Sequence, residues 1–294
     1  GAYQILYMRV PSHAAVSATV SASSKKNKSI VNAILRRISE EARINWPNEG
    51  TRLSYPEWII ELLIKDLGKK NAFEMLEKMN DAPSVSVRDD GYRQDLASQW
   101  ITDIIGVSKQ DLLLDMCSAP GGKATALAKQ ARKVVACDIN ESRHKLMREN
   151  KTNLSLENLT QVVSDGRSAP FSSHVFDHIL VDAPCSGLGV LHRRADSRWR
   201  IEEGDVKNLA KLQIDLLDSS VRLLKDGGVL SYSVCTVTNQ ETVDVVKSLE
   251  NLHPNLIPEK LFHERWRKIG NGLQILPQDF GTDGMSMFQW KLAN

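Results

Sequence analysis

Short continuous apolar runs alternate with longer segments of helical periodicity from residue 112 to residue 249, and this alternation restricts the fold more than any other feature of the sequence. In order, the segments are 112–116, 125–131, 133–139, 141–153, 159–164, 179–183, 206–224, 229–234 and 242–249. Strands that alternate with helices at this spacing are typical of βαβ units, which place parallel strands side by side. The sequence therefore predicts an α/β fold with a mainly parallel sheet, to which residues 285–292 add one more strand.

The chain before residue 107 has a different character. Residues 1–45 show helical periodicity, and Trp46-Pro-Asn-Glu-Gly50 has the composition of a linker. Further helical patterns, a short strand over residues 81–88 and an amphipathic helix over 94–106 are expected after it. Because 294 residues exceed the usual size of one domain, we expect a helical segment over 1–45, a linker and auxiliary region over 46–106, and a main domain over 107–294.

Composition and charge exclude some classes of protein. The net charge of +2 gives no argument for a polyanionic partner, yet the first 50 residues carry seven Lys or Arg against three Glu, so a solvated face and an RNA-facing one both stay open there. No apolar run reaches the roughly 20 residues of a membrane helix, and no signal peptide is recognisable, which predicts a soluble cytoplasmic protein without membrane contact. The four cysteines are widely spaced, which predicts free thiols and no metal site.

Two of these cysteines directly follow predicted strands. Cys185 lies in Asp182-Ala-Pro-Cys-Ser-Gly187 and Cys235 in Tyr232-Ser-Val-Cys-Thr236. If both strands are parallel members of one sheet, the two thiols lie at the sheet edge where such folds bind ligands. A cysteine beside a buried strand is more often a small core residue without chemistry. A glycine-rich turn at a third strand end, Asp115-Met-Cys-Ser-Ala-Pro-Gly-Gly-Lys123, favours the functional interpretation.

The glycine-rich turn does not match the common nucleotide-binding loops. A P-loop requires Gly where Cys117 stands and Ser or Thr where Ala124 follows the lysine, and the dinucleotide fingerprint G-x-G-x-x-G is absent. What remains is a tight turn in which Pro120 fixes φ and two glycines admit a ligand to a helix N-terminus. Such an end suits a carboxylate, for instance that of an amino-acid-like cofactor.

Aspartates recur at the ends of successive predicted strands. Asp138 follows the second strand, where an acid can accept both hydroxyls of a ribose. Asp165 follows the third strand and could accept from an adenine amino group, and Asp182 ends the fourth. Each of them could instead be a simple helix cap. Their regular recurrence favours a cofactor site.

These motifs together resemble those of the RNA cytosine-5 methyltransferases of the bacterial Sun/Fmu (RsmB) group, in the NOL1/NOP2/Sun superfamily. Residues 115–123 resemble the family loop D-x-C-A-A-P-G-G-K, residues 182–187 match D-A-P-C-S-G, and residues 232–236 resemble Y-S-T-C-[ST]. The resemblance implies a Rossmann-like methyltransferase that uses S-adenosylmethionine. It also extends to Val10–Val16 and Val31–Arg37, which look like the end of the NusB-like helical RNA-binding domain of that group, so residues 1–45 would be a partial domain of this kind.

The resemblance also implies roles for individual residues. Cys235 would attack cytosine C6, Cys185 would assist removal of the C5 proton, Asp182 would hydrogen-bond the N3 edge in its protonated form, and Lys123 would orient the cluster. The implied cofactor-binding residues are Cys117, Ser118, Ala119, Pro120, Gly121, Gly122, Lys123, Asp138, Asp165 and Asp182.

A basic run follows the Cys185 loop and suits contact with RNA phosphates and bases. Its candidates are Arg193, Arg194, Arg198, Trp199 and Arg200, although a solvated loop is the alternative. The run resembles the family segment R-R-x-P-D-x-x-W, with Ala195 where Pro is usual. A second departure is a stretch of several dozen residues that family members carry between the equivalents of Arg88 and Gly91 and that this chain lacks, which puts RNA docking in doubt.

The predicted function is methyl transfer from S-adenosylmethionine to C5 of a cytosine in RNA, with 16S ribosomal RNA as the favoured substrate and a monomer as the favoured state. A tRNA cytosine-5 methyltransferase and an RNA-binding ribosome-assembly factor with little turnover are alternatives. A DNA cytosine-5 methyltransferase is disfavoured, because those enzymes use the Pro-Cys thiol as nucleophile and lack a partner at the position of Cys235.

Overall fold

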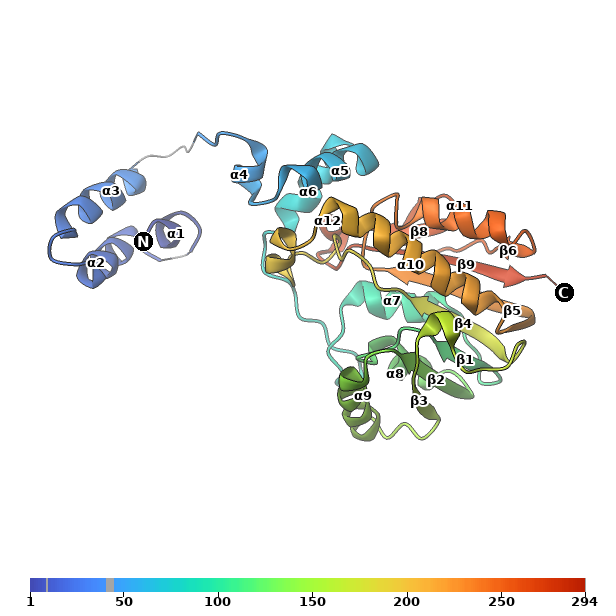
Figure 1. The fold of residues 1–294 in the computed structure, drawn as a ribbon. Coiled ribbons are helices and arrows are strands. Elements are labelled where there is room, and N and C mark those ends of the chain that lie inside the picture. Colours follow the sequence, from blue (N-terminus) through green and yellow to red (C-terminus); the bar gives the residue numbers. More distant parts are fainter. Residues whose placement is uncertain (9, 41–44, 294) are drawn as a thin grey trace. The chain divides into compact units, whose positions relative to one another are not determined.

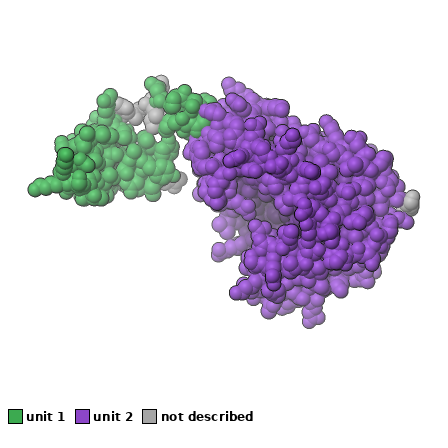
Figure 2. Space-filling view, viewed as in Figure 1, with its two compact units in different colours: residues 1–52 green, residues 53–294 purple. Residues whose placement is uncertain are grey.

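The computed structural model describes residues 1–8, 10–40 and 45–293 and divides into two compact units, residues 1–52 and residues 53–294 (Figure 2). In the first unit, α1 (Ala2–Leu6), α2 (Ser12–Ala22) and α3 (Lys28–Glu40) pack around Ala15, Val16 and Leu35. A short helix, α4 (Glu49–Leu53), lies at the division. These helices confirm the predicted α-helical character of this part of the chain, while residues 9 and 41–44 of the predicted segment lie outside the described residues.

The second unit is built on one large sheet, shown from green to red in Figure 1. Its strands are β1 (Leu112–Asp115), β2 (Lys133–Asp138), β3 (Leu159–Val163), β4 (Phe176–Asp182), β5 (Leu224–Val234), β6 (Leu256–Pro258), β7 (Arg267–Ile269), β8 (Gly272–Ile275) and β9 (Met285–Leu292). The order is β3-β2-β1-β4-β5-β9-β8-β7, with β6 paired to β9. Strands β1 to β5 are parallel and β9 runs antiparallel to β5. This arrangement confirms the predicted Rossmann-like α/β fold.

Helices cover both faces of the sheet because its central strands are apolar on both sides. On one face, α10 (Glu203–Val221) and α11 (Val243–Leu252) pack against residues that include Leu114, Ile179 and Tyr232. On the other face, α7 (Leu96–Ile104), α8 (Gly122–Ala128) and α9 (Glu141–Asn153) pack against a second set that includes Leu113 and Leu180. Successive side chains of a strand point to opposite faces, so neighbours such as Leu113 and Leu114 belong to different cores.

A third apolar core joins the helices before the sheet to the loops after β4 and β5. Helices α5 (Glu57–Leu67) and α6 (Lys69–Lys78), together with α12 (Pro277–Phe280) nearby, belong to this part of the chain. Leu188 and Leu191 from the loop after β4, and Val237 from the loop after β5, are fully buried against α5 and α6. This core therefore fixes the two loops that carry Cys185 and Cys235.

Two features of residues 53–106 differ from expectation or stay open. Residues 81–88 do not form the predicted strand; the structure has only an isolated bridge between Val87 and Arg93, within a tight hairpin. Residues 53–106 belong to the same compact unit as the sheet, and the predicted boundaries at residues 45 and 106 stay a prediction. None of the helices that the structure describes combines the length and apolar character needed to cross a bilayer.

Candidate active site

Cys185 and Cys235 lie side by side at the carboxyl ends of β4 and β5. Their Sγ atoms are 3.2 Å apart, within hydrogen-bonding distance for sulfur. The pairing of β4 with β5 places Asp182 opposite Ser233, so the two loops leave the sheet next to each other. The topology thus brings together two thiols that are 50 positions apart in the chain.

A buried ion pair stands beside the two thiols. Lys123 Nζ lies 2.8 Å from Asp182 Oδ2, and the lysine side chain is only 7% exposed. Asp182 Oδ1 accepts a hydrogen bond of 2.5 Å from Ser233 Oγ. Burial acts to lower the pKa of Lys123, but the Asp182 carboxylate and the nearby Cys235 raise it above its usual value overall. Lys123 therefore remains a cation next to Cys235, which favours a thiolate there. Cys185, Cys235, Asp182 and Lys123 are called the cysteine site below.

The two thiols differ in their electrostatic surroundings. The hydrogen bond with Cys235 is the largest cause that raises the pKa of Cys185 well above its ordinary value, followed by burial and by the charges of Cys235 and Glu241. Either sulfur could be the donor in the 3.2 Å contact, and the raised pKa favours the protonated form of Cys185.

The glycine-rich loop between β1 and α8 lies at the same edge of the sheet. Gly121 begins α8 with φ of 104°, and a Cβ there would come within 2.8 Å of Met147. Asp115 is 1% exposed, and neither of its carboxylate oxygens has a partner among the described residues. Burial, followed by the charge of Asp182, raises the pKa of Asp115 well above its usual value. A fully buried polar group without a partner is rare, and a functional role is one explanation for it.

The other predicted cofactor residues divide into main-chain and side-chain contributors. Asp138 ends β2 and accepts hydrogen bonds from the backbone N–H groups of Ala119 and Asn140, at 3.0 and 2.8 Å. Ser118 donates both its hydroxyl and its backbone N–H to Cys137 O, so it shapes the loop. Burial is the main cause that raises the pKa of Cys117, which keeps this thiol neutral. The loop therefore contributes mainly its backbone, including that of Gly121 and Gly122, and it lies between the carboxyl groups of Asp115 and Asp138.

Asp165 lies at the end of the next strand, but its carboxylate is already engaged. It accepts three hydrogen bonds from the Arg167 guanidinium, the shortest of 2.6 Å, and one from the Arg167 backbone. The Arg167 side chain holds the pKa of Asp165 below its usual value. A ligand at Asp165 would have to share or displace this arginine.

A hairpin covers the start of α8 where the sequence lacks the stretch that relatives carry. Arg88 donates to Gly122 O at 2.7 Å and to Thr125 Oγ1 at 3.2 Å, and it pairs with Asp90 at 2.7 Å. A Cβ on Gly122 would contact Gln94 and Tyr92, which shows how closely the hairpin packs on the loop. The shortened segment is therefore an ordered part of the sheet unit.

The arginines of the basic run have unequal surroundings. Arg198 is 6% exposed, stacks on the Tyr55 ring at 3.9 Å and donates to Ser54 O and Asn80 Oδ1. Arg193 pairs with Asp95 and Asp283. The guanidinium groups of both residues are thus engaged by protein partners, although Arg193 is exposed, and their predicted contact with RNA stays a prediction. Arg194, Trp199 and Arg200 are exposed at the surface.

Sequence reasoning missed several polar residues that surround the two thiols. Ser233, Ser186, Thr236, Gln213 and Glu241 are all buried and hydrogen-bonded around the cysteine loops. Ser233, Ser186 and Thr236 lie within the motifs already recognised, so their position was a usable signal. Gln213 and Glu241 had no such signal, since a single polar residue in a helix or loop is expected to be exposed. Within the described residues, no cluster of three or more His, Cys, Asp or Glu could hold a metal ion.

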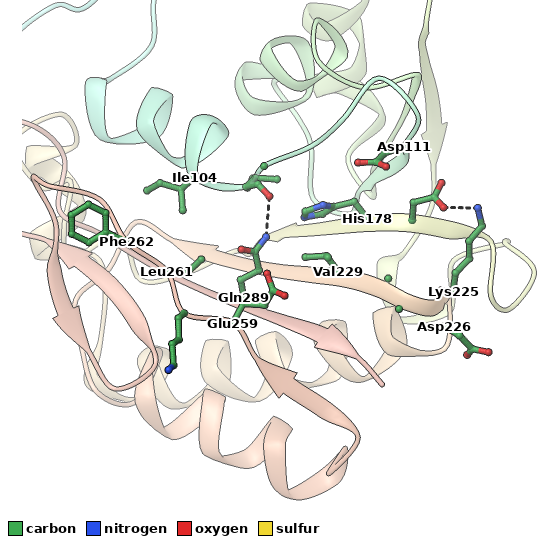
Figure 3. A pocket seen from close by; sticks show the side chains of 16 residues that line it. Ile104, Asp111, His178, Lys225, Asp226, Val229, Glu259, Leu261, Phe262 and Gln289 are labelled. Atoms are coloured by element: carbon green, nitrogen blue, oxygen red, sulfur yellow. Dashed lines mark hydrogen bonds and ion pairs between the residues drawn. The ribbon is translucent and has the colours of Figure 1, made fainter. Parts of the chain in front are cut away.

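A cavity of about 640 Å³ lies at the opposite, amino ends of the parallel strands (Figure 3). Its walls include His178, Lys225, Glu259 and Gln289. In Figure 3 the Lys225 ammonium pairs with a carboxylate, that of Asp177, at 2.6 Å. We refer to this hollow as the amino-end cavity.

Comparison with known proteins agrees with this geometry. The model of the family described as 16S rRNA methyltransferase RsmB/F matches residues 103–292, and the NusB family model matches residues 1–40. A protein named "Probable ribosomal RNA small subunit methyltransferase B" from Bacillus subtilis is 36% identical over 65% of this chain, which spans only 45% of that relative. "Ribosomal RNA small subunit methyltransferase B" from Yersinia pestis is 27% identical over 97% of this chain and 79% of its own length.

Two solved structures from Pyrococcus horikoshii share the fold. A structure of NSun6 with SFG has a TM-score of 0.63 at 27% identity and covers 69% of this chain and 53% of its own. A methyltransferase homolog protein has a TM-score of 0.71 at 20% identity, over 83% of this chain and 97% of its own.

Proposed function

The chain belongs to the 16S rRNA methyltransferase RsmB/F family, and from this premise we propose that it methylates C5 of a cytosine in small-subunit ribosomal RNA through a covalent adduct between Cys235 and C6. The observation that carries the proposal is the distance of 3.2 Å between the Cys185 and Cys235 sulfur atoms, next to the buried Lys123–Asp182 pair. Methylation at C5 by this route needs one sulfur to attack and a second group to remove a proton, and the cysteine site offers both.

S-adenosylmethionine is the cofactor, and when bound it supplies the methyl group. The main chain of residues 117–122 and the acids Asp115 and Asp138 would hold it. Their fit is supported by the unpartnered, buried Asp115 carboxyl beside the loop. Asp165 would reach the adenine side of the cofactor only by sharing Arg167.

Cys235 is the nucleophile in this proposal. Cytosine C5 is a weak nucleophile until a thiolate adds at C6 and makes C5 enamine-like. The Lys123 ammonium favours the thiolate of Cys235 by its charge. Asp182 accepts hydrogen bonds from Lys123 and Ser233 in the structure. We therefore assign the proton that offsets charge at cytosine N3 to Asp182, Lys123 and Ser233 together, and not to Asp182 alone.

Cys185 removes the C5 proton in the release step. In the free protein, its hydrogen bond with Cys235 is the main cause that raises its pKa. That cause disappears once the Cys235 sulfur is bound to C6, while burial and the Glu241 charge still act on Cys185. After Cys185 loses its proton to solvent, its thiolate acts as the base in this proposal. It then takes the C5 proton, the electron pair restores the C5–C6 double bond, and the bond between C6 and the Cys235 sulfur breaks to return the Cys235 thiolate.

The RNA approaches the exposed part of the basic run. Base edges in paired RNA lie in a deep, narrow groove, so the target cytosine must be unpaired or flipped out. Arg194 and Arg200 are placed for phosphates and Trp199, which is 60% exposed, for a base. A monomer in the cytoplasm is sufficient for this reaction.

Transfer of tritium from labelled S-adenosylmethionine to a 16S ribosomal RNA transcript tests the proposal. We expect Cys235→Ala to abolish transfer and Cys185→Ala to leave a protein–RNA adduct that survives a denaturing gel. Cys137→Ala is the matched control, because Cys137 is a buried free thiol in β2 away from the cysteine site. Turnover by the Cys235→Ala variant would contradict the assignment, and transfer to DNA or tRNA in preference to the 16S transcript would contradict the substrate.

A further inference from the structure

Glu241 is a buried carboxylate in the loop between β5 and α11, six positions after Cys235. Its exposed fraction is 0%, and among the described residues no Lys, Arg or His nitrogen forms an ion pair with it. Charged side chains are rarely buried without a cation, because the loss of hydration is costly. The burial of Glu241 therefore requires a structural explanation, which its hydrogen bonds provide.

Four donors surround the Glu241 carboxylate. Oε1 accepts from the Ser186 backbone N–H at 2.8 Å and from Gln213 Nε2 at 3.1 Å. Oε2 accepts from Ser186 Oγ at 2.5 Å and from Thr238 Oγ1 at 3.1 Å. All the acceptor positions of the carboxylate are thereby used. Two of the four bonds go to Ser186, the residue that directly follows Cys185.

The residue before Cys185 is held by the same group of side chains. Gln213 Nε2 also donates to Pro184 O at 2.9 Å, while Gln213 Oε1 accepts from Tyr232 Oη at 2.9 Å. The Tyr232 hydroxyl also lies 2.7 Å from the Glu241 backbone carbonyl, so its single proton is shared between the two acceptors. Cys185 is thus fixed on both sides along the chain, by Gln213 before it and by Glu241 after it.

Two more hydrogen bonds connect this arrangement to the Cys235 loop. Ser186 Oγ lies 3.0 Å from Thr236 Oγ1, and the Gly189 backbone N–H donates to Cys235 O at 3.1 Å. Because Glu241 belongs to the Cys235 loop and its partner Ser186 belongs to the Cys185 loop, its carboxylate ties the two loops together beyond the ends of β4 and β5. This link adds to the strand pairing and to the apolar contacts of the two loops.

We propose that Glu241 is a positioning residue that holds the Cys185 sulfur in place for the release step, through Ser186 and Gln213. This inference rests on the proposed cytosine-5 methylation and adds a residue that has no direct contact with either thiol. The Glu241 charge also contributes, after the hydrogen bond, burial and the Cys235 charge, to the raised pKa of Cys185.

The decisive variant is Glu241→Ala, assayed with tritiated S-adenosylmethionine and a 16S ribosomal RNA transcript. A misplaced base slows only the step it serves, so we expect kcat to fall on the order of 100-fold, while the rate of the first methyl transfer and kcat/KM change by less than about twofold, so that KM for RNA falls together with kcat. The adduct between protein and RNA should accumulate on denaturing gels, as expected for Cys185→Ala. The double variant Cys185→Ala/Glu241→Ala should be no slower than Cys185→Ala alone, because both changes disable one step.

Two further variants separate positioning from general damage. Glu241→Gln keeps the shape and can keep four hydrogen bonds if the Ser186 and Thr238 hydroxyls rotate, so it should restore turnover to within about tenfold of wild type. Gln289→Ala removes a glutamine that is 5% exposed and donates to Ile105 O and Ser231 Oγ at the far end of the strands, and should destabilise the fold without adduct accumulation.

The outcomes distinguish this inference from the proposed function. If wild type transfers methyl groups and Cys185→Ala traps an adduct, but Glu241→Ala loses the first transfer or traps nothing, the positioning role is wrong. Failure of Glu241→Gln to restore turnover also overturns it, and this variant serves as the test should Glu241→Ala not fold. If neither wild type nor Cys185→Ala forms an adduct, the proposed function itself fails.

Discussion

The two ends of the parallel strands both carry polar groups, yet these groups are arranged differently. At the amino-end cavity, the Lys225 ammonium is paired with Asp177, and Asp226 has a side chain that is 74% exposed (Figure 3). At the carboxyl ends, two thiols lie in contact and the Asp115 carboxyl is buried without a partner. If cavity size were the only criterion, the functional site would be placed at the amino ends of the strands. The two adjacent thiols and the Asp115 carboxyl without a hydrogen-bond partner instead favour a site at the carboxyl ends, where open α/β sheets bind their ligands.

The largest expected effect that sharpens this comparison is the loss of Lys123. Lys123→Met removes the cation that favours the Cys235 thiolate and leaves the half-buried Asp182 carboxylate without its partner. We expect methyl transfer to fall by on the order of 1,000-fold and unfolding free energy to fall by about 2 kcal/mol. Tritium transfer and urea denaturation measure the two effects.

A second substitution separates these two effects of Lys123. The double variant Lys123→Met/Asp182→Asn carries no buried charge at this position, so it should recover most of the stability lost by Lys123→Met. It should remain inactive, because the cation is still absent. Recovery of activity together with stability would mean that the pair serves only the fold, and the contrast between the two ends of the sheet would disappear.

Arg198 gives the next largest effect, on stability. Its guanidinium stacks on Tyr55 and donates to backbone and side-chain oxygens that would be left unpaired in Arg198→Ala. We expect the unfolding free energy to fall by about 3 kcal/mol, whereas Arg194→Ala, in the same run, should leave stability unchanged. A variant Arg198→Ala that is fully stable but binds RNA weakly would support the original sequence prediction.

These arginines show what the sequence could and could not predict. The α/β fold follows from the alternation of apolar runs with helical periods, and β1 to β5 agree with the predicted strands because each lies between segments with a helical pattern or a turn. Strands β6, β7 and β8 were missed because segments of three or four residues carry no clear period. The motifs located Cys185, Cys235, Asp182 and Lys123, since parallel strands end at one edge. The local sequence shows that a side chain is charged, but it does not show how deeply that side chain is buried or what it contacts. It therefore could not distinguish buried Arg198 from exposed Arg194, or predict the hydrogen-bond partners of Glu241.

At the amino-end cavity, His178 predicts a pH dependence of stability without one of activity. Burial lowers the pKa of His178 to about 4, an effect that Asp111 partly opposes. The unfolded chain takes up the proton near pH 6.5 and the folded protein only near pH 4, so stability is constant above this range and falls as the pH decreases through it. The expected loss is no more than about 3 kcal/mol by pH 4.

His178→Gln checks this expectation, because the amide can still reach Ser231 Oγ, the present partner of the imidazole at 2.9 Å. Urea unfolding between pH 7 and pH 4 should show a shallower loss of stability than in wild type, and methyl transfer at neutral pH should stay the same. If His178→Gln abolished methyl transfer while remaining folded, the amino ends would take part in the reaction and the comparison would be broken.

The smallest expected effect concerns one surface charge at each end of the sheet. Arg194 is exposed in the basic run beside the cysteine site, and Lys225 is a partly exposed cation at the amino-end cavity. Each change to alanine removes one positive charge, so long-range attraction to RNA weakens equally in both variants. Only a cation that contacts a phosphate releases a counterion, so Arg194→Ala should reduce the salt dependence of RNA binding by about one unit of slope, and Lys225→Ala should not. Binding isotherms at several salt concentrations measure this difference. If the salt dependence of RNA binding had the same slope in both variants, Arg194 would not contact an RNA phosphate. The RNA would then bind to another part of the sheet unit.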